Sequence, residues 1–212
     1  MAKHSQLALS DPAEWLGDYH PLAEQLGSAG GLVSLSSVTA LLRLAPVQDL
    51  GSLRRFLLAY WEQILLPIEL PAIRKAHGFA DRNELRELIQ FDSELGGEPV
   101  LRDFASPSRR VGQHQLQKLR PLRDQRFVQR YLGAVRRGEA QGWHTLVYGL
   151  TLALYSLPLR QGLAGYAQQT IRGFIYAAAP ALALSEHQCR ELFDQLCDTL
   201  PQALEAVVAS GS

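Results

Sequence analysis

The chain has 212 residues, of which 47% are apolar and 20% are charged, and its formal net charge is zero. This length is enough to bury a core without disulfides or metals, and the composition excludes both a disordered and a fibrous chain. We expect one all-α domain over residues 1–212, with residues 1–10 and 206–212 as flexible ends.

The sequence predicts a cytoplasmic protein. Charged residues interrupt the first twenty positions, so the apolar centre of a secretory signal is missing. The most membrane-like run, 143–157, is shorter than the roughly 20 residues that span a bilayer, and it reads as a helix buried in the core. Cys189 and Cys197 are eight residues apart in a helical pattern, too far for them to pair with each other.

Helix signals recur along the chain, as apolar residues three and four apart between capping residues, prolines and glycines. They predict helices over about 11–26, 35–42, 50–66, 72–77, 81–95, 106–119, 127–135, 143–157, 159–179 and 185–200. Pro67 and Pro180 are predicted to end helices, because proline has no backbone N–H and clashes with the preceding turn. Strand patterns are nearly absent. The sequence therefore predicts a single-domain helical bundle of about nine or ten helices.

Catalytic and metal-binding motifs are missing from the sequence. It has no Gly-x-Ser-x-Gly, no phosphate-binding loop, no His-Glu-x-x-His and no Cys-x-x-Cys. His187 and Cys189 are two residues apart and do not share a helical face, so we interpret them as a surface histidine and a core cysteine. We interpret His144 as a hydrogen-bonded core or cap residue. We expect no catalytic residue, no metal and no cofactor; a helical enzyme assembled only by the fold is a less favoured alternative.

Charge is distributed unevenly along the chain. Residues 1–100 carry 8 basic and 13 acidic residues, residues 101–137 carry 10 and 2, and residues 138–212 carry 3 and 6. The basic segment 101–137 is a candidate surface for nucleic acid or for an acidic protein, or it is a solvated face. It contains Arg109, Arg110, Lys118, Arg120, Arg123, Arg126, Arg130, Arg136 and Arg137. A helical nucleic-acid-binding or other protein-interaction module using this segment is therefore the alternative function, although we expect little nucleic-acid binding at physiological salt.

Several segments, taken in chain order, resemble the urease accessory protein F family. Residues 28–49 and 52–57 are similar to its N-terminal region, and Ser108-Arg109-Arg110-Val111-Gly112 is similar to its Ser-Arg-x-Met-Gly helix. His144, four residues before Tyr148-Gly149, resembles its His segment. Residues 173–179, followed by Gln188, resemble its C-terminal Ser-Ala-Ala helix and glutamine-containing stretch.

The resemblance implies a non-catalytic, all-α scaffold. Such a protein forms a homodimer, joins an accessory protein called UreD or UreH, and recruits the UreG GTPase during nickel insertion into urease. The residues expected to bind partners are Gly30, Gly31, Asp49, Ser108, Arg109, Arg110, Gly112, His144, Gly149 and Arg172.

Three positions depart from the family's pattern. Leu32-Val33-Ser34-Leu35 stands where the family has Phe-Ser-His-Ser, Thr39 stands in place of a glutamate, and Pro180 stands where a cation is usual. These changes imply altered partner contacts on a retained fold. We therefore expect a diverged member that does not replace a standard urease accessory protein F in a urease-activation assay.

Overall fold

A computed structural model describes residues 39–40, 42–119 and 126–209, and the structural statements below concern these residues. The helix predicted at 11–26 and the glycines Gly30 and Gly31 lie outside them, as does most of the helix predicted at 35–42.

The described residues form helices joined by turns, and none of them forms a strand, so the all-α prediction is confirmed. In chain order the elements are α5 (Leu50–Tyr60), the π-helical segment η1 (Trp61–Glu69), α6 (Leu70–Asp81), α7 (Leu85–Leu95), the short 3₁₀ helix η2 (Pro99–Phe104), α8 (Ala105–Lys118), α9 (Arg126–Arg136), α10 (His144–Leu154), α11 (Leu159–Leu182), α12 (Glu186–Cys197) and α13 (Leu200–Ala209).

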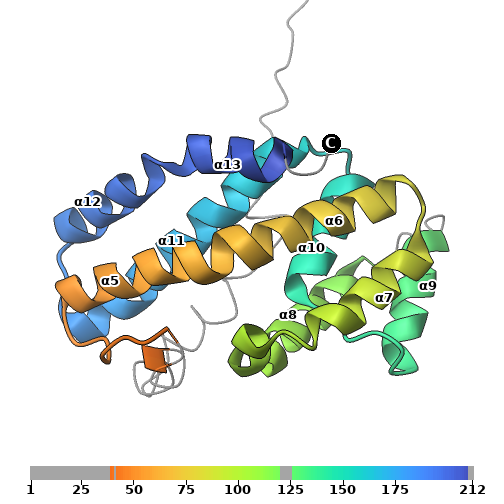
Figure 1. Ribbon diagram of the computed structural model, residues 1–212, viewed down its shortest axis with the longest axis horizontal. Coiled ribbons are helices and arrows are strands. Elements are labelled where there is room, and N and C mark those ends of the chain that lie inside the picture. Colours follow the sequence, from red (N-terminus) through yellow and green to blue (C-terminus); the bar gives the residue numbers. More distant parts are fainter. Residues whose placement is uncertain (1–38, 41, 120–125, 210–212) are drawn as a thin grey trace, which may run out of the picture.

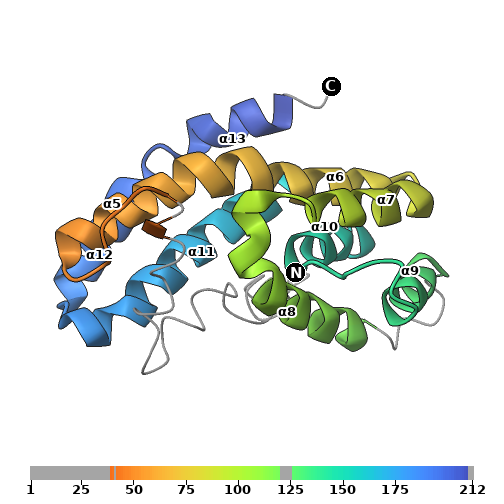
Figure 2. The same cartoon turned by 60° about the horizontal axis from the view of Figure 1, so that its bottom comes forward.

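The element α5 continues through η1 into α6 as one rod, which is drawn from orange to yellow in Figure 1. The rod packs on α11 through both α5 and α6, and on α10 through α6. Helices α12 and α13 cover α11, whereas α7, α8 and α9 gather at the other end of the molecule (Figures 1 and 2). Helix α10 thus lies between α6 and α8.

The core follows the apolar faces expected from the sequence. Every residue of α10 from 144 to 152 is buried, in agreement with its nearly uniform apolar character. Where the rod crosses α11, the ring of Phe174 lies edge-on to Phe56 and Tyr60, with ring centroids 5.6 and 4.9 Å apart. Aromatic pairs at this spacing and tilt add to the stabilisation that burial alone gives.

The prediction that Pro67 ends a helix is wrong. In η1 the turn is wider than in an α-helix, and the Leu70 N–H donates to the carbonyl of Leu65, five residues back. A π-helical turn leaves room for the proline ring, and the missing proline N–H removes only one donor from the segment. The helix predicted at 72–77 is therefore part of the same rod, which continues through Gly78 to Asp81.

The rod from Leu50 to Asp81 is also long and apolar enough to cross a membrane, judged by length and composition alone. Its most apolar 18-residue window has a mean hydropathy of 1.3, and 56% of that window is buried inside the protein. Since the rod packs on α10 and α11, its apolar character is accounted for by the core.

Two further helix boundaries differ from the prediction. Helix α11 does not end at Pro180 but reaches Leu182 and closes on Ala183, which is left-handed with φ 50° and ψ 42°. Because Pro180 has no backbone N–H, the carbonyl of Tyr176, four residues earlier, loses its usual donor. Pro180 and Tyr176 are both exposed, so water can satisfy this carbonyl. Asp81 was predicted to begin the next helix, but it is the last residue of α6, and a turn in which Asn83 has φ 58°, a conformation that asparagine tolerates, leads into α7.

The C-terminal helix predicted from Ser185 to Leu200 is divided in two. The predicted helix start at Ser185 is confirmed, and Ser185 caps α12 through a capping box with Gln188. A second helix, α13, then starts at Leu200 with Pro201 in its first turn, a position that suits proline, and it extends to Ala209. The helical part of the chain thus runs past residue 205. Because two predicted helices are joined in the rod and the predicted C-terminal helix is divided, the number of helices differs slightly from that expected.

Candidate partner-binding surface

Helix α8 is anchored to the start of α10 by two residues of the Ser-Arg-Arg-Val-Gly motif. The hydroxyl of Ser108 accepts a hydrogen bond of 3.2 Å from the backbone N–H of His144, 36 residues further on. A Cβ on Gly112 would overlap the Gly142 carbonyl oxygen and lie 2.7 Å from the His144 nitrogen. Glycine is therefore required where the two backbones meet.

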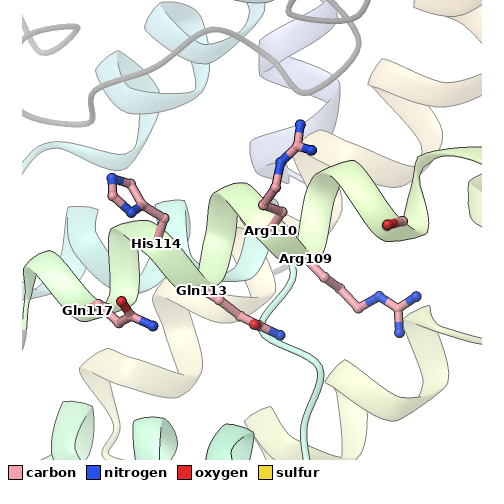
Figure 3. Close-up of a pocket in the computed structure, with 6 residues that line it drawn as sticks. Arg109, Arg110, Gln113, His114 and Gln117 are labelled. Carbon is pink, nitrogen blue, oxygen red and sulfur yellow. The ribbon is translucent and has the colours of Figure 1, made fainter.

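The same helix presents a polar stripe to solvent. A groove of about 450 Å³ is lined by Ser106, Arg109, Arg110, Gln113, His114 and Gln117. Figure 3 shows Arg110 and His114 pointing to one side of α8, and Arg109 and Gln113 to the other. Among the described residues that line the groove there is no carboxylate, so this surface is cationic.

Two of these side chains are positioned by backbone carbonyls. Arg109 Nε donates to the carbonyl of Ala105 at 3.0 Å, and Gln113 Nε2 donates to the carbonyl of Gln141 at 2.9 Å. The hydrogen bond at Nε leaves the two terminal nitrogens of the Arg109 guanidinium directed outward, in the planar arrangement that binds a carboxylate.

His144 and Gly149 lie in the interior. The His144 side chain is 4% exposed, and its ring packs against Tyr166 and Tyr148, with centroids 5.7 and 6.4 Å apart. This confirms its interpretation as a core residue at a helix start. Gly149 lies against α6, where a Cβ would come within 2.9 Å of Ala76 Cβ and would overlap the Ile73 carbonyl oxygen.

Asp49 and Arg172 lie on other elements. Asp49 is the exposed N-cap of α5, where its Oδ1 accepts the Ser52 N–H at 2.7 Å and the Ser52 hydroxyl accepts the Asp49 N–H at 2.9 Å. The hydrogen bond from the Ser52 backbone is the largest cause that lowers the pKa of Asp49. Arg172 is exposed on α11, and its guanidinium carbon lies 5.0 Å from the ring centre of Phe193 in α12. The structure thus groups Ser108, Gly112 and His144 and leaves these two apart.

Two buried carboxylates were not predicted from the sequence. Asp92 in α7 is fully buried and accepts hydrogen bonds from Tyr131 Oη and from the backbone N–H groups of Gln141 and Gly142, at 2.5, 2.6 and 2.9 Å. Its position between Leu88 and Leu95 on the apolar face of the predicted helix was the available signal.

Glu69, at the end of η1, is the second buried carboxylate. Tyr60 of α5 and Tyr166 of α11 lie close enough to Glu69 for its charge to act on both hydroxyls. Burial, and then the neighbouring Glu69 charge, raise the pKa of both tyrosines well above the ordinary value of 10.0. Nothing local marks Glu69 in the sequence, because the partners come from distant segments.

The predictions for the cysteines and His187 are confirmed. Cys189 is buried and the His187 side chain is exposed, and both cysteines are free thiols. Burial is the main cause that raises the pKa of Cys197, to about 11. Within the described ranges, no three His, Cys, Asp or Glu side chains are placed so that they share a metal ion.

The departures from the family pattern have different surroundings. Thr39 is 1% exposed, so its side chain does not lie on an open surface of this chain. Pro180 is exposed and stays a candidate for an altered contact, and the residues 32–35 lie outside the described part.

The basic segment is divided between α8 and α9. Arg137, just after α9, is neutralised by Glu139, with nitrogen–oxygen distances of 2.7 and 2.9 Å. Arg120 and Arg123 are outside the described residues. In the described part of the basic segment, the polar stripe on α8 therefore forms a groove that is lined by cations.

The chain was compared with known proteins. A model of the family described as UreF matches residues 47–197, a range that begins beside the Asp49 cap and ends at the last residue of α12. The chain belongs to the UreF family. No curated protein matches the chain. Membership confirms the resemblance seen in the sequence and indicates a role as a urease accessory protein.

Proposed function

We propose that this UreF protein is a cytoplasmic scaffold that forms a homodimer, joins a UreD-like or UreH-like protein and recruits a UreG-like GTPase for nickel insertion into urease. The observation that carries the proposal is the family match, which spans the helices from α5 to α12. Scaffold activity needs surfaces held in fixed positions rather than catalytic groups.

The geometry of α8 supports partner binding at its polar stripe. Ser108 and Gly112 fix the helix against α10, so Arg109 and Arg110 project from a rigid base. A rigid helix beneath the two arginines avoids the cost of ordering the backbone on binding, and arginine pairs with carboxylates in a planar, two-bonded geometry. We therefore assign the contact with an acidic accessory partner to this stripe.

The test is affinity purification of the tagged protein from its native host. We expect a UreD-like protein and a UreG-like GTPase to co-purify with the unchanged chain. The double variant Arg109→Glu, Arg110→Glu should lose at least one of them while keeping its helical spectrum. The matched control is Arg136→Glu, an exposed charge reversal on α9 in the same basic segment, which should retain both. Recovery of neither protein with the unchanged chain would contradict the proposed function.

A further inference from the structure

The polar stripe on α8 contains a side chain whose charge changes near neutral pH. Its two arginines stay charged throughout the physiological range, and Ser106, Gln113 and Gln117 are neutral. His114 differs, because a histidine side chain ordinarily gains or loses its charge between about pH 5 and 8. Among the described residues that line the groove, His114 is therefore the only one that can change the charge of the stripe in this range.

His114 lies where a partner bound to the arginines would meet it. It is exposed and follows Arg110 by one helical turn, and Figure 3 shows both side chains pointing to the same side of α8. Side chains four residues apart on a helix are neighbours, with about 5–6 Å between their Cβ atoms. An acidic segment that pairs with Arg110 is thus brought against the imidazole as well.

The charged groups around His114 are mostly cations. On α8 itself, Arg110 and Lys118 lie one turn to either side of it. The elements α9, α10 and η2 pack on α8. Their residues that carry a charge near neutral pH, or can gain one there, are Arg126, Arg130 and Arg136 in α9, the buried His144 in α10, and Arg102 and Asp103 in η2, where the Asp103 side chain lies outside the described part.

The described side chains of these four elements thus include no carboxylate that could hold the imidazole of His114 in its charged form. A carboxylate at this position would have to come from a bound partner. The charge of His114 and the occupancy of the stripe are then linked, because each favours the other.

We propose that His114 couples partner binding at the polar stripe to the uptake of a proton, an inference that rests on the acidic partner in the proposed function. A partner carboxylate stabilises the charged imidazole, so binding takes up a proton from solvent at a pH where the imidazole of the free chain is neutral. Binding is strongest below the range in which the imidazole titrates, and it weakens as the pH rises through that range. The arginines contribute equally on both sides of the range, since they stay charged.

The test measures the affinity of the purified full chain for a labelled hexaglutamate peptide by fluorescence anisotropy, at low ionic strength and at pH 6 and pH 8. Glutamate ordinarily titrates near about pH 4.3, so the charge of the probe is the same at both values. We expect the unchanged chain to bind the peptide about two- to fivefold more tightly at pH 6, which is the effect of one exposed ion pair.

Two substitutions of His114 test whether its charge is the cause. His114→Gln should bind the peptide weakly at both pH values, and His114→Lys should bind it tightly at both, so the affinity of neither variant should depend on pH. The matched control is His187→Gln, which removes an exposed histidine on α12, outside the groove and 3.9 Å from Glu191, and which should keep the pH dependence. Circular dichroism checks that each variant keeps its helices.

A pH dependence that both His114 variants lose and His187→Gln keeps supports the proposal. Absence of binding, equal affinity of the unchanged chain at both pH values, or a pH dependence that His114→Gln retains overturns it. Tighter binding of a single-stranded DNA of similar charge than of the peptide overturns the assignment of the stripe to an acidic protein. Because no accessory protein is present, the result is independent of the co-purification that tests the scaffold function.

Discussion

The hydroxyl of Tyr131 in α9 donates a hydrogen bond of 2.5 Å to the buried carboxylate of Asp92 in α7. The same carboxylate accepts the backbone N–H groups of Gln141 and Gly142, just before α10. One carboxylate therefore joins two helices and the segment that leads into a third. Desolvation keeps Tyr131 protonated, because burial and then the Asp92 charge raise its pKa well above the ordinary value.

Removing this carboxylate should destabilise the protein strongly. We expect Asp92→Ala to lower the free energy of unfolding by about 3–5 kcal/mol, because it leaves a buried hydroxyl and two buried N–H groups without their acceptor. Tyr131→Phe removes a single donor and should cost about 1.5–3 kcal/mol. Urea unfolding measures both values. Losses below about half a kcal/mol for both variants would show that the carboxylate does not join these segments.

The contact of α8 with α10 predicts an unequal effect of two helical glycine substitutions. Gly112→Ala should destabilise the chain by about 1–3 kcal/mol or more, since the new methyl group meets backbone atoms that cannot rotate away. The matched control is Gly133→Ala in α9, where the Cβ would meet only the movable end of the Arg137 side chain, at 3.1 Å. This control should be neutral or stabilising by up to about 1 kcal/mol. Equal melting temperatures for the two variants would contradict the tight α8–α10 contact.

Neighbouring leucines on α5 should also respond differently. Leu57 is 3% exposed and Leu58 is 40% exposed. We expect Leu57→Ala to cost about 2–5 kcal/mol because it leaves a cavity in the core, and Phe174→Ala to cost about the same or more. Leu58→Ala should change the stability by less than about 1 kcal/mol. If chemical unfolding shows a larger loss of stability for Leu58→Ala than for Leu57→Ala, the face of the rod that carries Leu57 does not pack against the core.

Stability should fall at alkaline pH. Burial raises the pKa of Tyr60 and of Tyr166 well above 10.0, whereas in the unfolded chain both ionise near that value. Above pH 10 the unfolded state therefore binds fewer protons than the folded state, and each tyrosine contributes up to about 1.4 kcal/mol of lost stability per pH unit. Tyr60→Phe should make this decline shallower, whereas Tyr155→Phe, at an exposed position, should not. The measurement is urea unfolding of the unchanged chain and of both variants from pH 9 to 11. If the free energy of unfolding falls equally steeply with pH in all three proteins, ionisation of Tyr60 is not a cause of the decline.

The helix starts beside Asp49 and Ser185 could be predicted from the sequence, because the three- and four-residue apolar spacing begins there, and the structure adds a capping box at each. The course of the chain at Pro67 and Pro180 was not predictable in this way. Whether a proline ends a helix depends on whether a wider turn or an exposed carbonyl absorbs the missing N–H, and packing decides this.

The candidate surface was predictable only in part. The sequence motif places Ser108, Arg109 and Gly112 on one helix, but their separation into packing and exposed residues depends on α10, which starts 32 residues after Gly112. Asp92 and Glu69 gain their roles from partners on other helices; the place of Asp92 on the apolar face of its helix is a local signal, whereas Glu69 has none.

The central claim is that this UreF protein serves urease maturation in its own host. The most direct measurement is urease activity in host cells that lack its gene, grown with ample nickel and with the urease protein level monitored. We predict that activity is lost although the urease protein is present, and that the unchanged chain restores activity but the double variant Arg109→Glu, Arg110→Glu does not. Full urease activity in cells that lack the protein would contradict the account.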